Sequence, residues 1–178
     1  NPTDTLARNG SRAETQKMDP PPYVPGMDAA GVVDQVGSGV TTGIRVGDAA
    51  MAMVVPRGAH GAYRESLVLK ASSVVPSPKG FTHVQACSLP MNGLTATLSL
   101  DLLGLKEGQV LAVTGGAGAY GGYMIELGKE AGLTVISDAS DADMALVKEL
   151  GADIVVPRGD DFAEKVRAHF PNGVDGLA

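Results

Sequence analysis

The spacing of apolar residues divides the chain into two regions. Residues 1 to about 80 are rich in glycine and proline, and their apolar runs are short. Clusters of turn-forming residues separate these runs, which are AGVVDQV (30–36), DAAMAMVV (48–55) and AYRESLVL (62–69). Short β-branched runs between frequent turns predict the strands of a small β-barrel or sandwich.

Beyond residue 80, strand-like apolar runs alternate with helical patterns. The predicted strands are 109–114, 133–137, 153–156 and 173–178, and the predicted helices are 81–104, 119–132, 141–151 and 160–170. Ser140 and Asp143 resemble a capping box at the start of the helix over 141–151. This alternation predicts a parallel sheet built from right-handed βαβ units.

A glycine-rich stretch, VLAVTGGAGAYGGY (110–123), follows one of the predicted strands and opens a helix. Unpaired N–H groups at a helix start attract anions, and glycine lets a pyrophosphate approach the backbone. We therefore predict a dinucleotide site, with a plain glycine-rich turn as the alternative. Its predicted contacts are Gly115, Gly116, Ala117, Gly118, Ala119, Tyr120 and Gly121.

The context of the glycines matters more than their number. Gly37 and Gly39 also follow a strand-like run, but they lead into a β-branched segment, so they predict a plain turn. After Gly115–Gly121, by contrast, Asp138 closes the next predicted strand. An acid at that place in a βαβ unit binds the ribose hydroxyls of a dinucleotide.

Composition and charge narrow the class of protein. The 178 residues are 44% apolar and 19% charged, with a formal net charge of −6 and a single cysteine, Cys87. An acidic chain is a poor nucleic-acid binder, and no apolar run is long enough to span a bilayer. One cysteine excludes a disulfide framework. We expect a cytoplasmic protein that binds neither nucleic acid nor membrane.

Residues 25–53, 61–96 and 148–156 resemble the medium-chain dehydrogenase/reductases, and within them the zinc-independent quinone oxidoreductases. The resemblance implies a GroES-like β-barrel catalytic domain over 1–80. It implies a Rossmann-type NAD(P)-binding domain over 81–178, whose α/β fold is a doubly wound parallel sheet. Family members are longer and often homodimeric, so we expect both domains to be partial and the full-length protein to be a homodimer.

The resemblance also shows which residues stand at the family's zinc-ligand positions. The ligand positions of the zinc-dependent relatives match Asn1, Met27 and Pro90. An amide, a thioether and a proline cannot form a tetrahedral zinc site, which needs thiolate, imidazole or carboxylate ligands. The three histidines, His60, His83 and His169, stand singly along the chain. We therefore expect no metal.

Without zinc, hydride transfer suits a small acceptor that is already electron-poor, such as a quinone or an α,β-unsaturated carbonyl. By resemblance, Asn1 is the candidate donor to the acceptor oxygen, although it also fits a turn before Pro2. Thr3 matches a proton-relay hydroxyl, and Leu6 stands where many quinone reductases have a tyrosine. Thr95 matches a residue near the nicotinamide ribose and phosphates.

The choice between NADH and NADPH stays open at this level. Asp138 would repel a 2′-phosphate and favours NADH, whereas the family mostly uses NADPH. In the NADPH interpretation, Ser137 or Ser140 binds the phosphate with Lys148 or Arg158 near. Two other functions are also open: a non-catalytic dinucleotide-binding protein, and the enoyl reductase module of a larger synthase.

Overall fold

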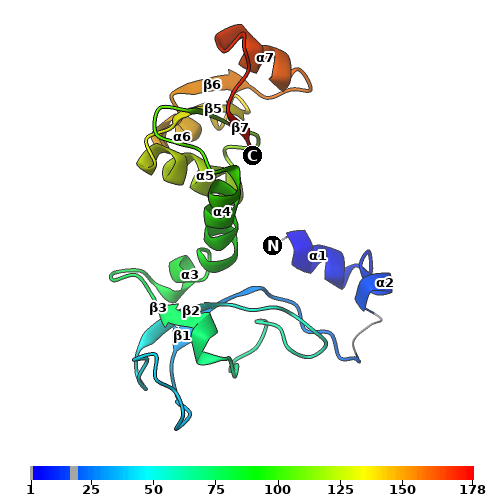
Figure 1. Ribbon diagram of the computed structural model, residues 1–178. Helices are drawn as coiled ribbons and strands as arrows, with labels where there is room; N and C mark the ends of the chain where they lie inside the picture. The colour runs from blue at the N-terminus through cyan, green and yellow to red at the C-terminus, as the bar shows by residue number, and fades with distance from the viewer. Residues whose placement is uncertain (1, 17–19) are drawn as a thin grey trace. The chain divides into compact units, whose positions relative to one another are not determined.

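The computed structural model describes residues 2–16 and 20–178 (Figure 1). The chain packs as two compact units, one ending at Met91 and the other comprising Asn92–Ala178. The division predicted at residue 80 refers to the domains of the whole protein and stays a prediction.

The first unit contains short helices and a three-stranded antiparallel sheet in the order β1-β2-β3. Its elements are α1 (Pro2–Arg8), α2 (Ala13–Gln16), β1 (Asp28–Val32), β2 (Ala49–Met53), the 3₁₀ helix η1 (Ala71–Ser73), β3 (Val74–Pro76) and α3 (His83–Ala86). Register pairs Ala30 with Met51, and Met51 with Val75. The runs at 30–36 and 48–55 thus correspond to strands, displaced and shortened at their ends.

The prediction of a strand over residues 62–69 is wrong, because this segment forms no strand in the structure. Its first residues bond to a loop instead of a strand, because Ala62 and Tyr63 donate their N–H groups to the carbonyls of Gly26 and Pro25. Val68, at the other end of the segment, is 89% exposed. The third strand of the sheet is β3, which the sequence did not predict.

The second unit is a four-stranded parallel sheet in the order β6-β5-β4-β7. Its strands are β4 (Val110–Val113), β5 (Thr134–Ala139), β6 (Ile154–Pro157) and β7 (Gly176–Leu177). Its helices are α5 (Ala119–Glu130), α6 (Met144–Glu149), α7 (Phe162–His169) and most of α4 (Pro90–Leu103). The predicted strand–helix alternation is confirmed.

The helix predicted over 81–104 is two helices. A capping box between Thr82 and Gln85 starts α3, which ends after one turn, and α4 begins at Pro90. Proline suits a first helical position, because its missing N–H would have no intrahelical partner there.

The core of the second unit follows from the alternation of side chains along its strands. On β4, Leu111 and Val113 pack with Met124 and Ile125 of α5. Ala112, between them, faces the opposite side and packs with Val166 of α7. Helices therefore cover both faces, as in a doubly wound sheet. This arrangement places the glycine-rich stretch at the carboxyl end of β4.

In the first unit, Asp28 on β1 accepts the N–H of Met91 at 2.6 Å, in the first turn of α4. Burial raises the pKa of the Asp28 carboxyl; the Met91 hydrogen bond opposes this, and the charge of Asp4 adds to it. A raised pKa means that the charged form of Asp28 destabilises the folded state above that pKa.

We expect Asp28→Asn to raise the melting temperature at pH 7, since the amide oxygen still accepts from Met91 without a partly buried charge. The gain should shrink as pH falls through the raised pKa and vanish below the ordinary value of 3.8. Thermal melting at several pH values tests this, with exposed Asp34→Asn as the matched control. A lower melting temperature at pH 7 would show instead that charge at the helix start outweighs the cost of burial.

Candidate dinucleotide-binding and active site

Residues 115–118, the glycine loop, connect β4 to α5 at the carboxyl edge of the parallel sheet. Gly115 has a φ of +68°, a left-handed conformation that glycine adopts without strain. The Gly118 N–H donates to the Gly115 carbonyl at 2.9 Å, which closes a tight turn. The chain therefore reverses within four residues and enters α5 directly.

Two of the glycines are needed for packing within the protein itself. A Cβ on Gly116 would lie 2.2 Å from the Ser137 Oγ, and a Cβ on Gly121 would lie 2.3 Å from the Gly115 carbonyl oxygen. The sequence interpretation attributed the glycine content to the approach of a ligand. At Gly116 and Gly121, part of the reason is the close contact of the loop with β5 and α5.

The first turn of α5 is suited to an anion. Gly118 is the residue before the helix, and no side chain caps the N–H groups that follow. Those of Ala119, Tyr120 and Gly121 precede the first intrahelical bond, in which Gly122 donates to Gly118. Around Gly115, a Cβ would meet no atom within 4 Å. These features fit a pyrophosphate.

Two predicted contact residues use their side chains within the protein. Ala117 and Tyr120 pack against the core. The Tyr120 hydroxyl also donates to the Ser99 Oγ on α4 at 3.0 Å. These two side chains therefore have a packing role within the protein that does not depend on a dinucleotide. Thr95 is exposed and lies one turn before Ser99 on α4, so it shares a helix face with the partner of Tyr120.

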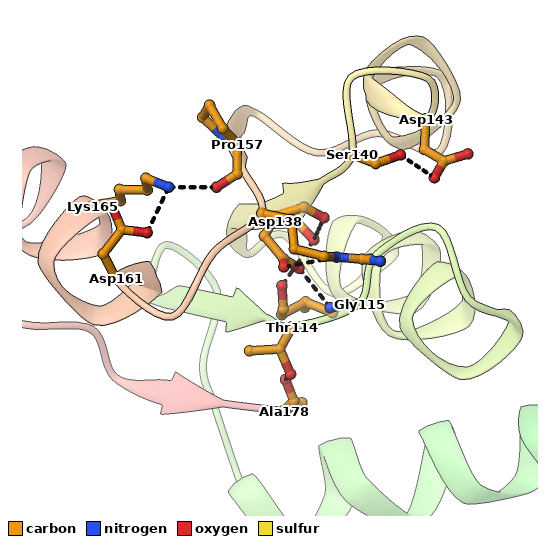
Figure 2. A network of polar contacts seen from close by, with 12 residues as sticks. Thr114, Gly115, Asp138, Ser140, Asp143, Pro157, Asp161, Lys165 and Ala178 are labelled. Carbon is orange, nitrogen blue, oxygen red and sulfur yellow. Dashed lines mark hydrogen bonds and ion pairs between the residues drawn. The ribbon is translucent and has the colours of Figure 1, made fainter.

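Asp138 near the end of β5 is held at both carboxylate oxygens. Its Oδ1 accepts the Gly115 N–H at 2.6 Å (Figure 2), and its Oδ2 lies 3.3 Å from Arg158 Nε. The side chain of Asp138 is 8% exposed, whereas that of Arg158 is 51% exposed. Asp138 thus fastens the glycine loop to the neighbouring strand and fixes a guanidinium beside it.

Ser140 follows β5, and its hydroxyl donates to Asp143 Oδ2 at 2.6 Å (Figure 2). The predicted capping box is wrong, because α6 begins only at Met144 and the Asp143 side chain makes no cap hydrogen bond. The two residues instead belong to a turn in which Asp143 N–H donates to the Ser140 carbonyl.

In the first unit, Thr3 lines a cavity of about 190 Å³ together with Asp4, Arg12 and Tyr23. Asp4 is buried and its Oδ1 accepts the Gly26 N–H at 2.9 Å, which joins α1 to the loop before β1. Sequence reasoning missed Asp4, Arg12 and Tyr23. Asn1, the other predicted catalytic residue, lies outside the described residues.

The zinc-ligand positions can be followed only in part. Met27 precedes β1 and Pro90 starts α4, while Asn1 is not described. Over residues 2–16 and 20–178, no group of three or more His, Cys, Asp or Glu side chains is placed to hold a metal ion. Within the same residues, no helix is long and apolar enough to cross a membrane.

We expect Gly121→Ala to lower the free energy of unfolding by about 1–3 kcal/mol, because the new methyl group would overlap the Gly115 carbonyl. The adjacent Gly122→Ala is the matched control. Its Cβ would lie 3.4 Å from the mobile end of the Leu150 side chain, so stability should change by less than about 1 kcal/mol. Denaturant unfolding measures both, and equal losses would contradict this packing.

Comparison with known proteins places the geometry in a family. Residues 1–79 match the alcohol dehydrogenase GroES-like domain. The chain is 32% identical to a probable quinone oxidoreductase of Leishmania amazonensis and to a chloroplastic NADPH-dependent alkenal/one oxidoreductase of Arabidopsis thaliana. It is 31% identical to a zinc-type alcohol dehydrogenase-like protein of Staphylococcus epidermidis. Each match covers 98% of this chain and 49%, 45% and 52% of the respective relative.

Solved structures of similar proteins indicate the same family. An alcohol dehydrogenase superfamily protein from Novosphingobium aromaticivorans is 29% identical, with a TM-score of 0.90 over 99% of this chain and 53% of that one. A mycobacterial protein complexed with NADPH is 32% identical, with a TM-score of 0.83 over 99% and 54%. The chain spans about half the length of the relatives it matches. With its GroES-like region, parallel sheet and glycine loop, it belongs to the medium-chain dehydrogenase/reductase family.

Proposed function

We propose that the protein is a nicotinamide-dependent oxidoreductase that transfers hydride to a small electron-poor acceptor, a quinone or an α,β-unsaturated carbonyl. The observation that carries the proposal is the uncapped start of α5 behind the glycine loop, with Asp138 bound to Gly115. The names of the quinone and alkenal/one oxidoreductases among the relatives support this acceptor class.

In this proposal the chain's own groups hold and orient the dinucleotide. The N–H groups of the first turn of α5 donate to the pyrophosphate, and Gly118 keeps side-chain atoms away from it. When bound, the nicotinamide supplies the hydride. Thr3, which lines the cavity of the first unit, is the described candidate for moving a proton at its hydroxyl. Asn1 is the candidate donor to the acceptor oxygen.

We further propose that turnover needs no zinc. The support is the identity of the residues at the three family ligand positions: Asn1, Met27 and Pro90 offer no thiolate, imidazole or carboxylate. An electron-poor acceptor spreads the developing charge by conjugation, so modest hydrogen-bond donors can stabilise it. A cytoplasmic homodimer that acts on a small molecule is the form of the protein that this proposal implies.

The test is oxidation of NADH and NADPH by the protein with a simple quinone and a simple enone, before and after EDTA treatment. We expect unchanged turnover after chelation. Loss of turnover that added zinc restores would overturn the zinc-independent mechanism, since a metal Lewis acid supplies several kcal/mol of stabilisation where it is used. Tight dinucleotide binding without turnover of either acceptor would overturn the enzymatic function.

A further inference from the structure

The cavity of about 190 Å³ in the first unit is lined by both apolar and polar side chains. Ala7, Val24 and Pro56 belong to its apolar lining, and Thr3 and Thr15 contribute hydroxyl groups. Pockets for drug-sized ligands measure roughly 300–1,000 Å³, so this cavity suits a smaller molecule. Its mixed lining fits a ligand with an apolar body and a few polar groups.

The two charged residues of the cavity differ in what they bind. Asp4 is 8% exposed, and its Oδ1 accepts the Gly26 N–H at 2.9 Å. Arg12 is exposed, and within residues 2–16 and 20–178 its guanidinium makes no hydrogen bond or ion pair. The buried negative charge is therefore engaged with the backbone. The positive charge of Arg12 is the one that can still bind a ligand.

The turn that carries Arg12, between α1 and α2, is fixed by local hydrogen bonds. The Ser11 N–H donates to Asn9 Oδ1 at 3.0 Å. The Thr15 hydroxyl donates to the Arg12 carbonyl at 2.9 Å, which ties Arg12 to the helix that follows. The backbone of Arg12 is thus held beside the cavity, while its guanidinium has no partner in the described part of the chain.

We propose that this cavity binds the acceptor and that the Arg12 guanidinium binds a carboxylate on it, which rests on the function proposed above. The substrate class is then a small α,β-unsaturated carbonyl compound that bears a carboxylate, such as a 4-oxo-2-enoate. A guanidinium presents paired N–H donors that match the two oxygens of a carboxylate. Thr3 lines the same cavity, so the candidate proton-transfer group and the recognition group serve one ligand.

The reaction on such an acceptor is a two-electron reduction of its C=C bond. The carbon β to the ketone gains the hydride of the reduced nicotinamide, the α carbon gains a proton, and the double bond becomes a single bond. For 4-oxopent-2-enoate the product is 4-oxopentanoate. The carboxylate is unchanged in this step, so both substrate and product can report on Arg12.

The first test compares kcat/KM for 4-oxopent-2-enoate and for its neutral methyl ester, in the full chain and in its Arg12→Gln variant. The two compounds differ in intrinsic reactivity, so their ratio is compared between proteins. We expect Arg12→Gln to lower the value for the carboxylate by roughly 5- to 30-fold, through KM, and to leave that for the ester unchanged. This loss lies between those of an exposed ion pair and a desolvated one.

Two variants serve as controls. Arg12→Lys keeps the charge without the paired donors and should recover part of the preference. Exposed Arg45→Gln removes the same charge elsewhere in the first unit and should leave both values unchanged. Equal losses for carboxylate and ester in Arg12→Gln would show that Arg12 only supports the shape of the cavity, and would overturn the proposal.

NMR titration with 4-oxopentanoate and with neutral 2-pentanone gives a readout without turnover. We expect the carboxylate to bind more tightly, and to lose this preference in Arg12→Gln and at high salt. Turnover of both acceptors with a ratio that Arg12→Gln does not change would overturn the proposal and leave the proposed function standing. Turnover of neither would overturn the proposed function, and the titration would then decide the carboxylate site by itself.

Discussion

The hydrogen bond from Gly115 N–H to the Asp138 carboxylate is the contact on which the candidate site depends. It joins the end of β5 to the loop that follows β4, at 2.6 Å and in a partly buried position. A buried N–H without an acceptor would cost about 1–3 kcal/mol, so the acid compensates the turn that Gly115 makes. The same carboxylate orients Arg158. Loop, strand end and guanidinium are therefore one connected unit.

Most of the second unit could be predicted from its sequence, because its pattern is local. Parallel strands covered on both faces are mostly apolar, as in Val110–Val113, and β5 carries apolar Val135 and Ile136 before its polar carboxyl end. The strands of the first unit were harder to predict from the sequence. Its strands are short, and whether a run pairs depends on distant residues. Ala62 and Tyr63 bond to the loop at 25–26, whereas β3 pairs with β2, and neither choice is visible in the local pattern.

The candidate site likewise has a part that the local sequence predicts and a part that depends on distant contacts. The glycine loop could be located, since strand, glycines and helix follow one another in the chain. The ion pair of Asp138 with Arg158 depends on the register of β5 and β6, although the two residues are 20 positions apart. Asp4 and Gly26, 22 positions apart, meet only because α1 folds against the loop before β1. Asp138 could be named as a site residue from the sequence, whereas Asp4 could not. In both cases the hydrogen-bond partner is determined by the topology of the fold.

Glycines of the loop are needed for packing as well as for the approach of a ligand. Gly116 and Gly121 are required by contacts of the loop with Ser137 and Gly115, whether or not a ligand is present. Their presence therefore indicates a tightly packed strand–loop–helix unit, and a substitution there changes folding before it changes binding. Chemical selectivity has to come from side chains outside that packed unit, at the ends of β5 and β6. There a charge can change with little effect on the loop, provided that Gly115 keeps its acceptor.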